Sequence, residues 1–145
     1  PACPVNGPQA DARGEQVAVA WYTGADSTAQ VKVAFSADAG ATFAAPARVD
    51  AGNPEGRADV ILLRDGAALV SWVERTDGDG AEVRVRRVAR NGRMGEPRTV
   101  AASTSTRSSG FPRMVPAGDD VVFAWTAPGQ PAQVRVARMP LSALR

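Results

Sequence analysis

Residues 16–21 read Gln-Val-Ala-Val-Ala-Trp, residues 67–72 read Ala-Ala-Leu-Val-Ser-Trp, and residues 120–125 read Asp-Val-Val-Phe-Ala-Trp. The three tryptophans, Trp21, Trp72 and Trp125, are 51 and 53 residues apart in a chain of 145 residues. A period of about fifty residues indicates a repeat architecture in which each copy is one supersecondary unit. The copies are therefore the starting point for the fold.

Each tryptophan is followed by a second strand pattern. Residues 31–34, 83–86 and 134–137 read Val-Lys-Val-Ala, Val-Arg-Val-Arg and Val-Arg-Val-Ala, and this alternation is typical of a β-strand. Gly, Asp and Pro between the two patterns predict hairpin loops. A further strand is expected before each tryptophan strand, at residues 9–12, 58–63 and 111–115, and a fourth at 46–49 and 97–100. Each complete copy thus has four short antiparallel strands.

A lone four-stranded meander leaves an apolar face uncovered, so the copies must stack on one another. We predict an all-β protein, a β-propeller of three four-stranded antiparallel blades at residues 1–52, 53–103 and 104–145, with the third blade incomplete at the chain end. Propellers close with about four to eight blades, so we expect half of a six-bladed ring. Its partner is either the remaining blades of a longer protein or a second copy in a homodimer.

Composition excludes several functions. Seventeen basic and fifteen acidic residues give a formal charge of +2, spread along the chain, so we expect no nucleic-acid partner. The sequence has no histidine, which removes the commonest general base and metal ligand, and we predict no metal and no cofactor. No apolar run is long enough for a membrane helix, so we expect no membrane insertion. Cys3 is the single cysteine, which rules out an internal disulfide.

Residues 36–43, Ser-Ala-Asp-Ala-Gly-Ala-Thr-Phe, resemble the Asp-box (BNR repeat) of sialidases and related propellers. The pattern, Ser-x-Asp-x-Gly-x-Thr followed by Trp or Phe, is met at Ser36, Asp38, Gly40, Thr42 and Phe43. We expect the Asp38 carboxylate to accept hydrogen bonds from nearby amides, Gly40 to take a positive φ, and Phe43 to pack back onto the blade. In these families the box is structural and lies at the blade periphery.

Four further segments resemble the second half of bacterial exported proteins of the sialidase family. They are Cys-Pro-Val-Asn-Gly-Pro at residues 3–8, Val-Ala-Val-Ala-Trp at 17–21, Gly-Arg-Ala-Asp-Val at 56–60 and Ser-Gly-Phe-Pro-Arg at 109–113. The resemblance implies a secreted protein, extracellular or periplasmic. It also implies further blades before Pro1, with a cysteine available to Cys3.

Sialidases use an arginine triad, a Tyr-Glu pair and an aspartate as catalytic residues. The resemblance does not assign these catalytic residues to positions in this chain. The one tyrosine, Tyr22, would need a carboxylate such as Glu74 beside it, but its counterparts Val73 and Thr126 favour a packing role. The glutamates show no repeated pairing of the kind that glycosidases need. We therefore predict no catalytic residue, and a chain that is catalytically incomplete by itself.

Polar residues at the entry to each innermost strand are the candidates for ligand binding, because those entries converge on the mouth of the central channel. They are Asn6, Arg57, Asp59 and Arg113. Forked arginine donors suit an anionic or hydroxyl-rich ligand such as a glycan. In the alternative interpretation, Arg57 and Arg113 tie neighbouring blades together through backbone carbonyls or Asp59.

Three functions follow from these observations. The first is a scaffold or a glycan-binding module. The second is part of a sialidase-type glycoside hydrolase whose catalytic residues lie in other blades. The third is a half-propeller that assembles with itself as a homodimer.

Overall fold

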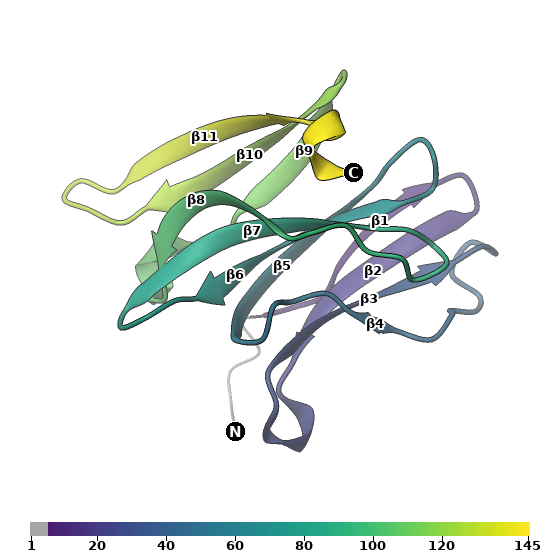
Figure 1. Ribbon diagram of the computed structural model, residues 1–145, viewed down its shortest axis with the longest axis horizontal. Coiled ribbons are helices and arrows are strands. Elements are labelled where there is room, and N and C mark those ends of the chain that lie inside the picture. The colour runs from purple at the N-terminus through teal and green to yellow at the C-terminus, as the bar shows by residue number, and fades with distance from the viewer. Residues whose placement is uncertain (1–5) are drawn as a thin grey trace.

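The computed structural model describes residues 6–145, so Cys3 and its pairing lie outside the described residues. The chain forms three antiparallel sheets in sequence order, which we call blades 1, 2 and 3 (Figure 1). Blade 1 contains β1 (Gln9–Arg13), β2 (Gln16–Thr23), β3 (Gln30–Ser36) and β4 (Ala47–Arg48). Blade 2 contains β5 (Pro54–Leu62), β6 (Ala68–Arg75), β7 (Gly80–Val88) and β8 (Arg98–Thr104). Blade 3 contains β9 (Arg113–Ala117), β10 (Asp120–Ala127) and β11 (Gln133–Pro140).

Short 3-10 helices lie between β2 and β3, η1 (Ala25–Ser27), between β8 and β9, η2 (Arg107–Ser109), and after β11, η3 (Leu141–Leu144). Within residues 6–145, no helix is long and apolar enough to span a membrane. Strand β9 begins two residues later than the sequence predicts. Pro112, just before it, has no amide hydrogen to donate to β10, and this explains the later start.

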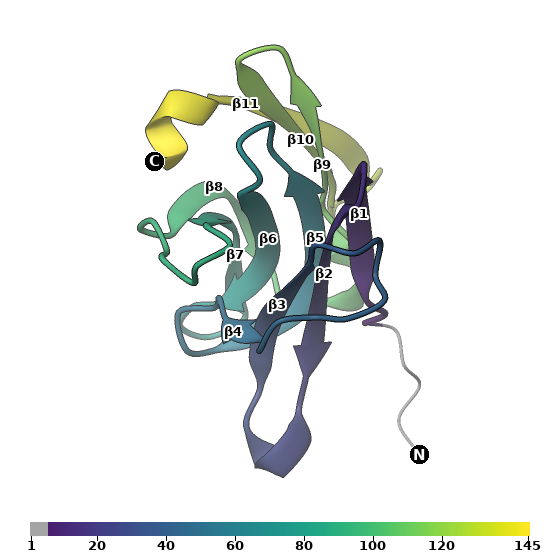
Figure 2. The same ribbon diagram turned by 90° about the vertical axis from the view of Figure 1, so that its right-hand side faces the viewer.

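The blades stack face to face, and one apolar core lies in each gap between them. Figure 2 shows β1, β5 and β9 gathered on one side of the molecule, with β4, β8 and β11 outside them. Strand β5 contacts both β1 and β9, so these three are the innermost strands of their blades. The predicted all-β class and the stacking of antiparallel sheets are confirmed.

The repeated tryptophans contribute to both cores. Trp72 is fully buried against blade 1, in a core with Ala18 and Val33. Trp125 is 8% exposed and packs against blade 2, beside Leu69. Both therefore face the blade that precedes their own, because side chains alternate between the two faces of a strand.

The loop of residues 36–43 is closed by hydrogen bonds around Asp38. Its carboxylate accepts hydrogen bonds from the Thr42 hydroxyl at 2.6 Å, the Thr42 amide at 2.9 Å and the Ser36 hydroxyl at 2.7 Å. These bonds lower the pKa of Asp38 to about 2. Gly40 has φ of 88°, as expected, and its amide donates to the Ser36 hydroxyl at 2.9 Å.

Phe43 differs from the expectation that it packs back onto the blade. Its side chain is 45% exposed, and its ring lies over Gly40, with Cζ 3.9 Å from the position that a Cβ on Gly40 would take. The loop is thus closed by the hydrogen bonds of Asp38 and Ser36, and the ring of Phe43 lies outside the core.

Candidate functional site

Three polar residues occupy the same place in their blades. Each lies on the innermost strand, opposite the residue that precedes the repeated tryptophan. They are Gln9 in β1, Asp59 in β5 and Arg113 in β9, opposite Ala20, Ser71 and Ala124 respectively. We call these three residues the axial cluster, because the repeat brings them to one level where the innermost strands meet.

Arg113 connects the three members of the axial cluster. Its Nη1 donates a hydrogen bond to Oε1 of Gln9 at 2.6 Å and lies 3.6 Å from Oδ1 of Asp59. One guanidinium from blade 3 therefore contacts a side chain of blade 1 and a side chain of blade 2. Asp59 and Arg113 are thus brought together with Gln9, and this contact between blades is also the one that the alternative interpretation predicts for Arg113.

The two charged groups of the cluster differ in exposure. Asp59 is 4% exposed, and its Oδ2 accepts a hydrogen bond from the Met114 amide at 2.8 Å. Burial raises the pKa of Asp59, while the Met114 amide and the charge of Arg113 act in the opposite direction. The Arg113 side chain is 58% exposed and is therefore accessible to solvent. A buried carboxylate thus holds an accessible guanidinium, which suits the recognition of carboxylates and hydroxyl groups.

Phe111 is an aromatic residue two positions before Arg113 in the sequence. Its side chain is 49% exposed, and the Arg57 guanidinium carbon lies 6.0 Å from its ring centroid. The sequence places Phe111 at the start of an expected strand and in the 109–113 segment, but does not predict it as a binding residue. The signal for it is the pair Phe-Pro directly before an arginine, since β9 begins after Pro112 and Phe111 lies outside the sheet.

Arg57 joins blade 2 to the segment before blade 3. Its guanidinium donates to the Ser109 hydroxyl at 2.6 Å and to the carbonyl oxygens of Thr106 at 2.9 Å and Ser105 at 3.2 Å. The residue is 7% exposed and has φ of 53°, a conformation that is uncommon outside glycine. Burial lowers the pKa of Arg57, and the Glu55 carboxylate opposes this effect. These contacts match the alternative in which Arg57 ties blades together.

Asn6 lies beside Arg57 and binds backbone. Its Oδ1 accepts a hydrogen bond from the Arg57 amide at 2.9 Å, and its Nδ2 donates to the Glu55 carbonyl at 3.2 Å. The four residues predicted from sequence therefore form two contacts, Asn6 with Arg57 and Asp59 with Arg113. Only the second contact presents an exposed charged group.

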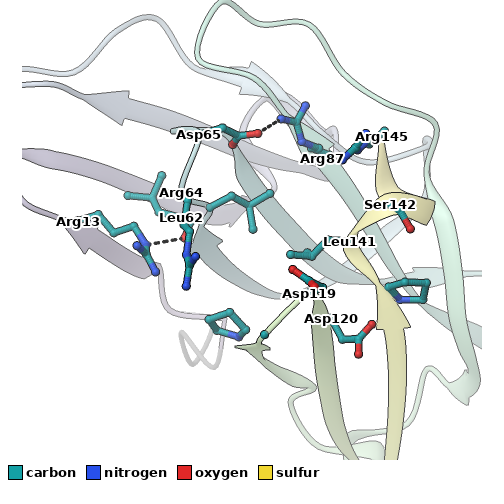
Figure 3. Close-up of a pocket in the computed structure, with 14 residues that line it drawn as sticks. Arg13, Leu62, Arg64, Asp65, Arg87, Asp119, Asp120, Leu141, Ser142 and Arg145 are labelled. Atoms are coloured by element: carbon teal, nitrogen blue, oxygen red, sulfur yellow. Dashed lines mark hydrogen bonds and ion pairs between the residues drawn. The ribbon is translucent and has the colours of Figure 1, made fainter.

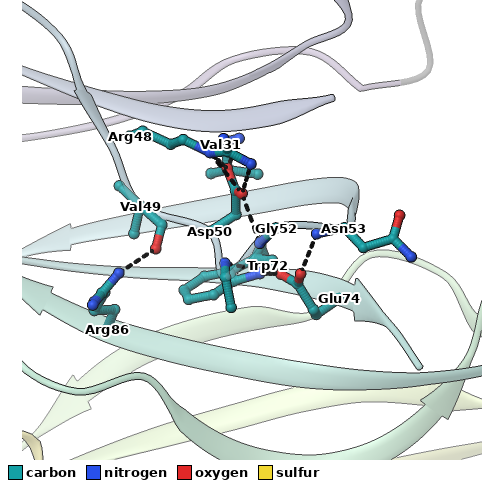
Figure 4. Close-up of polar contacts among 10 residues, drawn as sticks. Val31, Arg48, Val49, Asp50, Gly52, Asn53, Trp72, Glu74 and Arg86 are labelled. Atoms are coloured by element: carbon teal, nitrogen blue, oxygen red, sulfur yellow. Dashed lines mark hydrogen bonds and ion pairs between the residues drawn. The ribbon is translucent and has the colours of Figure 1, made fainter. Parts of the chain in front are cut away.

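Glu74 and Asp50 anchor the connection between blades 1 and 2 (Figure 4). The Glu74 carboxylate accepts hydrogen bonds from the Trp72 indole and from the Asn53 amide, the latter at 2.6 Å. Asp50 accepts from the Val31 amide at 2.7 Å. Because Glu74 is 3% exposed and is bonded to the indole and to backbone amides, its arrangement is that of a structural residue.

Tyr22 packs against the backbone of blade 2. Its ring carbons Cγ and Cδ2 lie 2.8 and 2.9 Å from the point where a Cβ on residue 56 would be, so Gly56 is the residue that permits this contact. Gly56 also has φ of 89°. The geometry agrees with the packing role that the sequence predicts for Tyr22.

A cavity of about 920 Å³ lies at the opposite ends of the innermost strands (Figure 3). Its charged lining residues are Arg13, Arg64, Asp65, Arg87, Asp119, Asp120 and Arg145. Arg13 Nε donates to the Leu62 carbonyl at 3.1 Å, and Arg87 forms an ion pair with Asp65. Charges of both signs therefore line this cavity, as they do in the axial cluster.

No protein-family model matches the sequence, and neither does any curated protein. Among solved structures, the chain is similar to a thermostable family-43 glycoside hydrolase, with a TM-score of 0.56 and 11% sequence identity over 91% of this chain. That enzyme is a five-bladed β-propeller, so the likeness confirms the predicted β-propeller fold. The aligned region is 49% of the enzyme's chain, so this protein spans about half of its length. The resemblance to sialidases stays a prediction.

Proposed function

We propose that this chain is a carbohydrate-binding portion of a β-propeller, in which the axial cluster holds the ligand and the 36–43 loop is a structural Asp-box. The observation that carries the proposal is the contact of Arg113 with Gln9 and Asp59, because three blades contribute equivalent residues to one exposed polar group. The likeness to a glycoside hydrolase propeller supports a glycan-related module.

The chemistry of the cluster is consistent with a hydroxyl-rich or anionic glycan. Arg113 offers forked donors to a carboxylate or to vicinal hydroxyls, and the Gln9 amide both donates and accepts. Phe111 provides an exposed ring on the segment that leads into Arg113. The resemblance to exported sialidase-family proteins supports an extracellular or periplasmic setting for this function.

A glycan array with the 145-residue chain tests this proposal, followed by calorimetry on the best oligosaccharide. We expect Arg113→Ala to weaken binding at least tenfold. Arg93→Ala is the matched control, because Arg93 is an exposed arginine in the turn after β7, and it should bind like the wild type. An array without signal above background, or equal affinities of both variants, would overturn the proposal.

The second candidate is part of a glycoside hydrolase, of sialidase type, whose other catalytic groups lie in further blades. The observation that favours it is the buried Asp59 carboxyl with its raised pKa, a property of general acids. Glycosidases need two carboxyls across one pocket, and the axial cluster has one. Turnover of a fluorogenic sialoside by a full-length protein that includes those blades, abolished in Asp59→Asn, would favour the enzyme over the binding module.

A further inference from the structure

Ser71 has a buried hydroxyl group with no hydrogen-bond partner within residues 6–145. The residue is 0% exposed and lies in β6, directly before the repeated tryptophan Trp72. Buried hydroxyl groups are nearly always hydrogen-bonded, so an unpaired one indicates a bound water molecule or a functional contact. The Ser71 hydroxyl therefore needs a partner that the neighbouring strands do not supply.

The repeat shows that the fold does not require a hydroxyl group at this position. The residues directly before the other two repeated tryptophans are Ala20 and Ala124. Among the three blades, the serine occurs in blade 2, which is also the blade whose axial-cluster residue is an aspartate. Strand pairing places Ser71 directly opposite this aspartate, Asp59. The hydroxyl group thus accompanies the carboxylate.

Ser71 and Asp59 both point toward blade 3. Trp72 packs against blade 1, and successive side chains of a strand alternate between its two faces. Leu69, which shares the face of Ser71, belongs to the core between blades 2 and 3. The Asp59 side chain lies on the same side, because its Oδ2 accepts a hydrogen bond from the Met114 amide. Directly opposite residues of antiparallel strands have Cβ atoms roughly 4.5–5.5 Å apart, so the hydroxyl and carboxyl groups are neighbours.

The other carboxylate oxygen of Asp59 faces the guanidinium of Arg113. Oδ1 lies 3.6 Å from Arg113 Nη1, which is longer than a direct hydrogen bond. Water molecules often bridge polar groups at such distances. The Ser71 hydroxyl, Asp59 Oδ1 and Arg113 Nη1 therefore belong to one region between blades 2 and 3, and two of these three residues are buried.

We propose that Ser71, Asp59 and Arg113 hold one buried water molecule, and that Ser71 is thereby a positioning residue of the axial cluster. Three polar partners are the number that a buried water molecule typically has. The water accepts hydrogen bonds from the Ser71 hydroxyl and from the Arg113 guanidinium, and it donates to Asp59 Oδ1. The water site is independent of any ligand, whereas the positioning of Arg113 for a glycan rests on the proposed function.

Two measurements on the ligand-free protein test the water site. High-resolution crystal structures should show the water in the wild type and no water there in Ser71→Ala. Nuclear magnetic resonance should show a higher pKa for the Asp59 carboxyl in Ser71→Ala, because a hydrogen bond to the ionised carboxylate favours that form. The charges of Arg113 and Asp11, which also act on Asp59, are unchanged in this variant.

Two further variants serve as controls. Ser71→Thr keeps the hydroxyl group and should keep the wild-type pKa of Asp59. Ser103→Ala makes the same substitution in β8 of the same blade and should also leave this pKa unchanged. An unchanged pKa in Ser71→Ala, an equal change in Ser103→Ala, or a direct contact of Ser71 Oγ with Asp59 Oδ1 without water would overturn the proposal.

The affinity for the best oligosaccharide from the glycan array tests the positioning role. Ser71→Ala should weaken binding at least threefold, although Ser71 is buried and does not touch the ligand, and Ser71→Thr should restore it. Wild-type affinity in Ser71→Ala would overturn the positioning role. A water site confirmed in the crystal, together with an array without signal, would overturn the proposed function and leave the water site established.

Discussion

The guanidinium of Arg113 lies 3.6 Å from the Asp59 carboxylate, and the two residues hold equivalent positions on the innermost strands of neighbouring blades. The same arginine donates to Gln9, the equivalent residue of blade 1. A repeat that serves packing thus also gathers three different polar groups.

Removing the Asp59 carboxyl should destabilise the fold, because the buried Met114 amide loses its acceptor. We expect Asp59→Ala to lower the free energy of unfolding by about 1–3 kcal/mol. Asp59→Asn keeps an oxygen that accepts the hydrogen bond from the Met114 amide, so it should lower the free energy of unfolding by clearly less. Urea unfolding of the three proteins measures this, and equal losses in both variants would contradict the role of the hydrogen bond.

We expect Arg57 to be a structural residue, although the sequence predicts it as a candidate for ligand binding. Arg57→Ala removes three hydrogen bonds to the segment before blade 3. Hydrogen bonds from charged groups contribute about 1.5–3 kcal/mol each, so we expect a loss of about 2 kcal/mol or more in urea unfolding. Arg57→Lys should not restore it, since one ammonium cannot reproduce the fork. If Arg57→Ala is as stable as the wild type, the hydrogen bonds of Arg57 do not stabilise the fold.

Glu74 should be among the costliest single substitutions. Glu74→Ala leaves the Trp72 indole and the Asn53 amide without their acceptor, and we expect a loss of at least about 3 kcal/mol. Glu74→Gln keeps one acceptor oxygen and should lose less. Glu96→Ala, at an exposed glutamate, is the control and should change stability little. Similar melting temperatures for Glu74→Ala and Glu96→Ala would refute the assignment.

The 36–43 loop should give the protein an acid-sensitive component. Because hydrogen bonds from Thr42 and Ser36 lower the pKa of Asp38 from 3.8 to about 2, the ionised form is favoured in the folded state. Its contribution to stability is complete above pH 3.8 and is lost as the pH falls toward 2. In Asp38→Asn this part of the pH dependence should disappear. Thermal unfolding of both proteins across that window measures the difference, and parallel curves would rule the effect out.

Much of the fold can be predicted from the sequence, because the tryptophan and valine strands have strict alternation at a fixed period. The axial cluster is harder to predict. The sequence predicts Asn6 as the ligand-binding residue of blade 1, whereas strand pairing places Gln9 opposite the residue before Trp21. The first strand has a weak sequence pattern, so this register cannot be predicted from it. The positive φ of Arg57 and the exposure of Phe43 depend on tertiary contacts, which a local pattern does not contain.

The central claim is that the axial cluster is the ligand site, and nuclear magnetic resonance tests it directly. We would titrate labelled protein with the best oligosaccharide from the array and follow the Gln9 side-chain amide, the Arg113 Nε–H and the Met114 backbone amide. If the ligand binds at the axial cluster, these signals shift together, with one dissociation constant. Shifts confined to Arg64, Ser142 and the other residues of the cavity at the opposite end of the strands would contradict it.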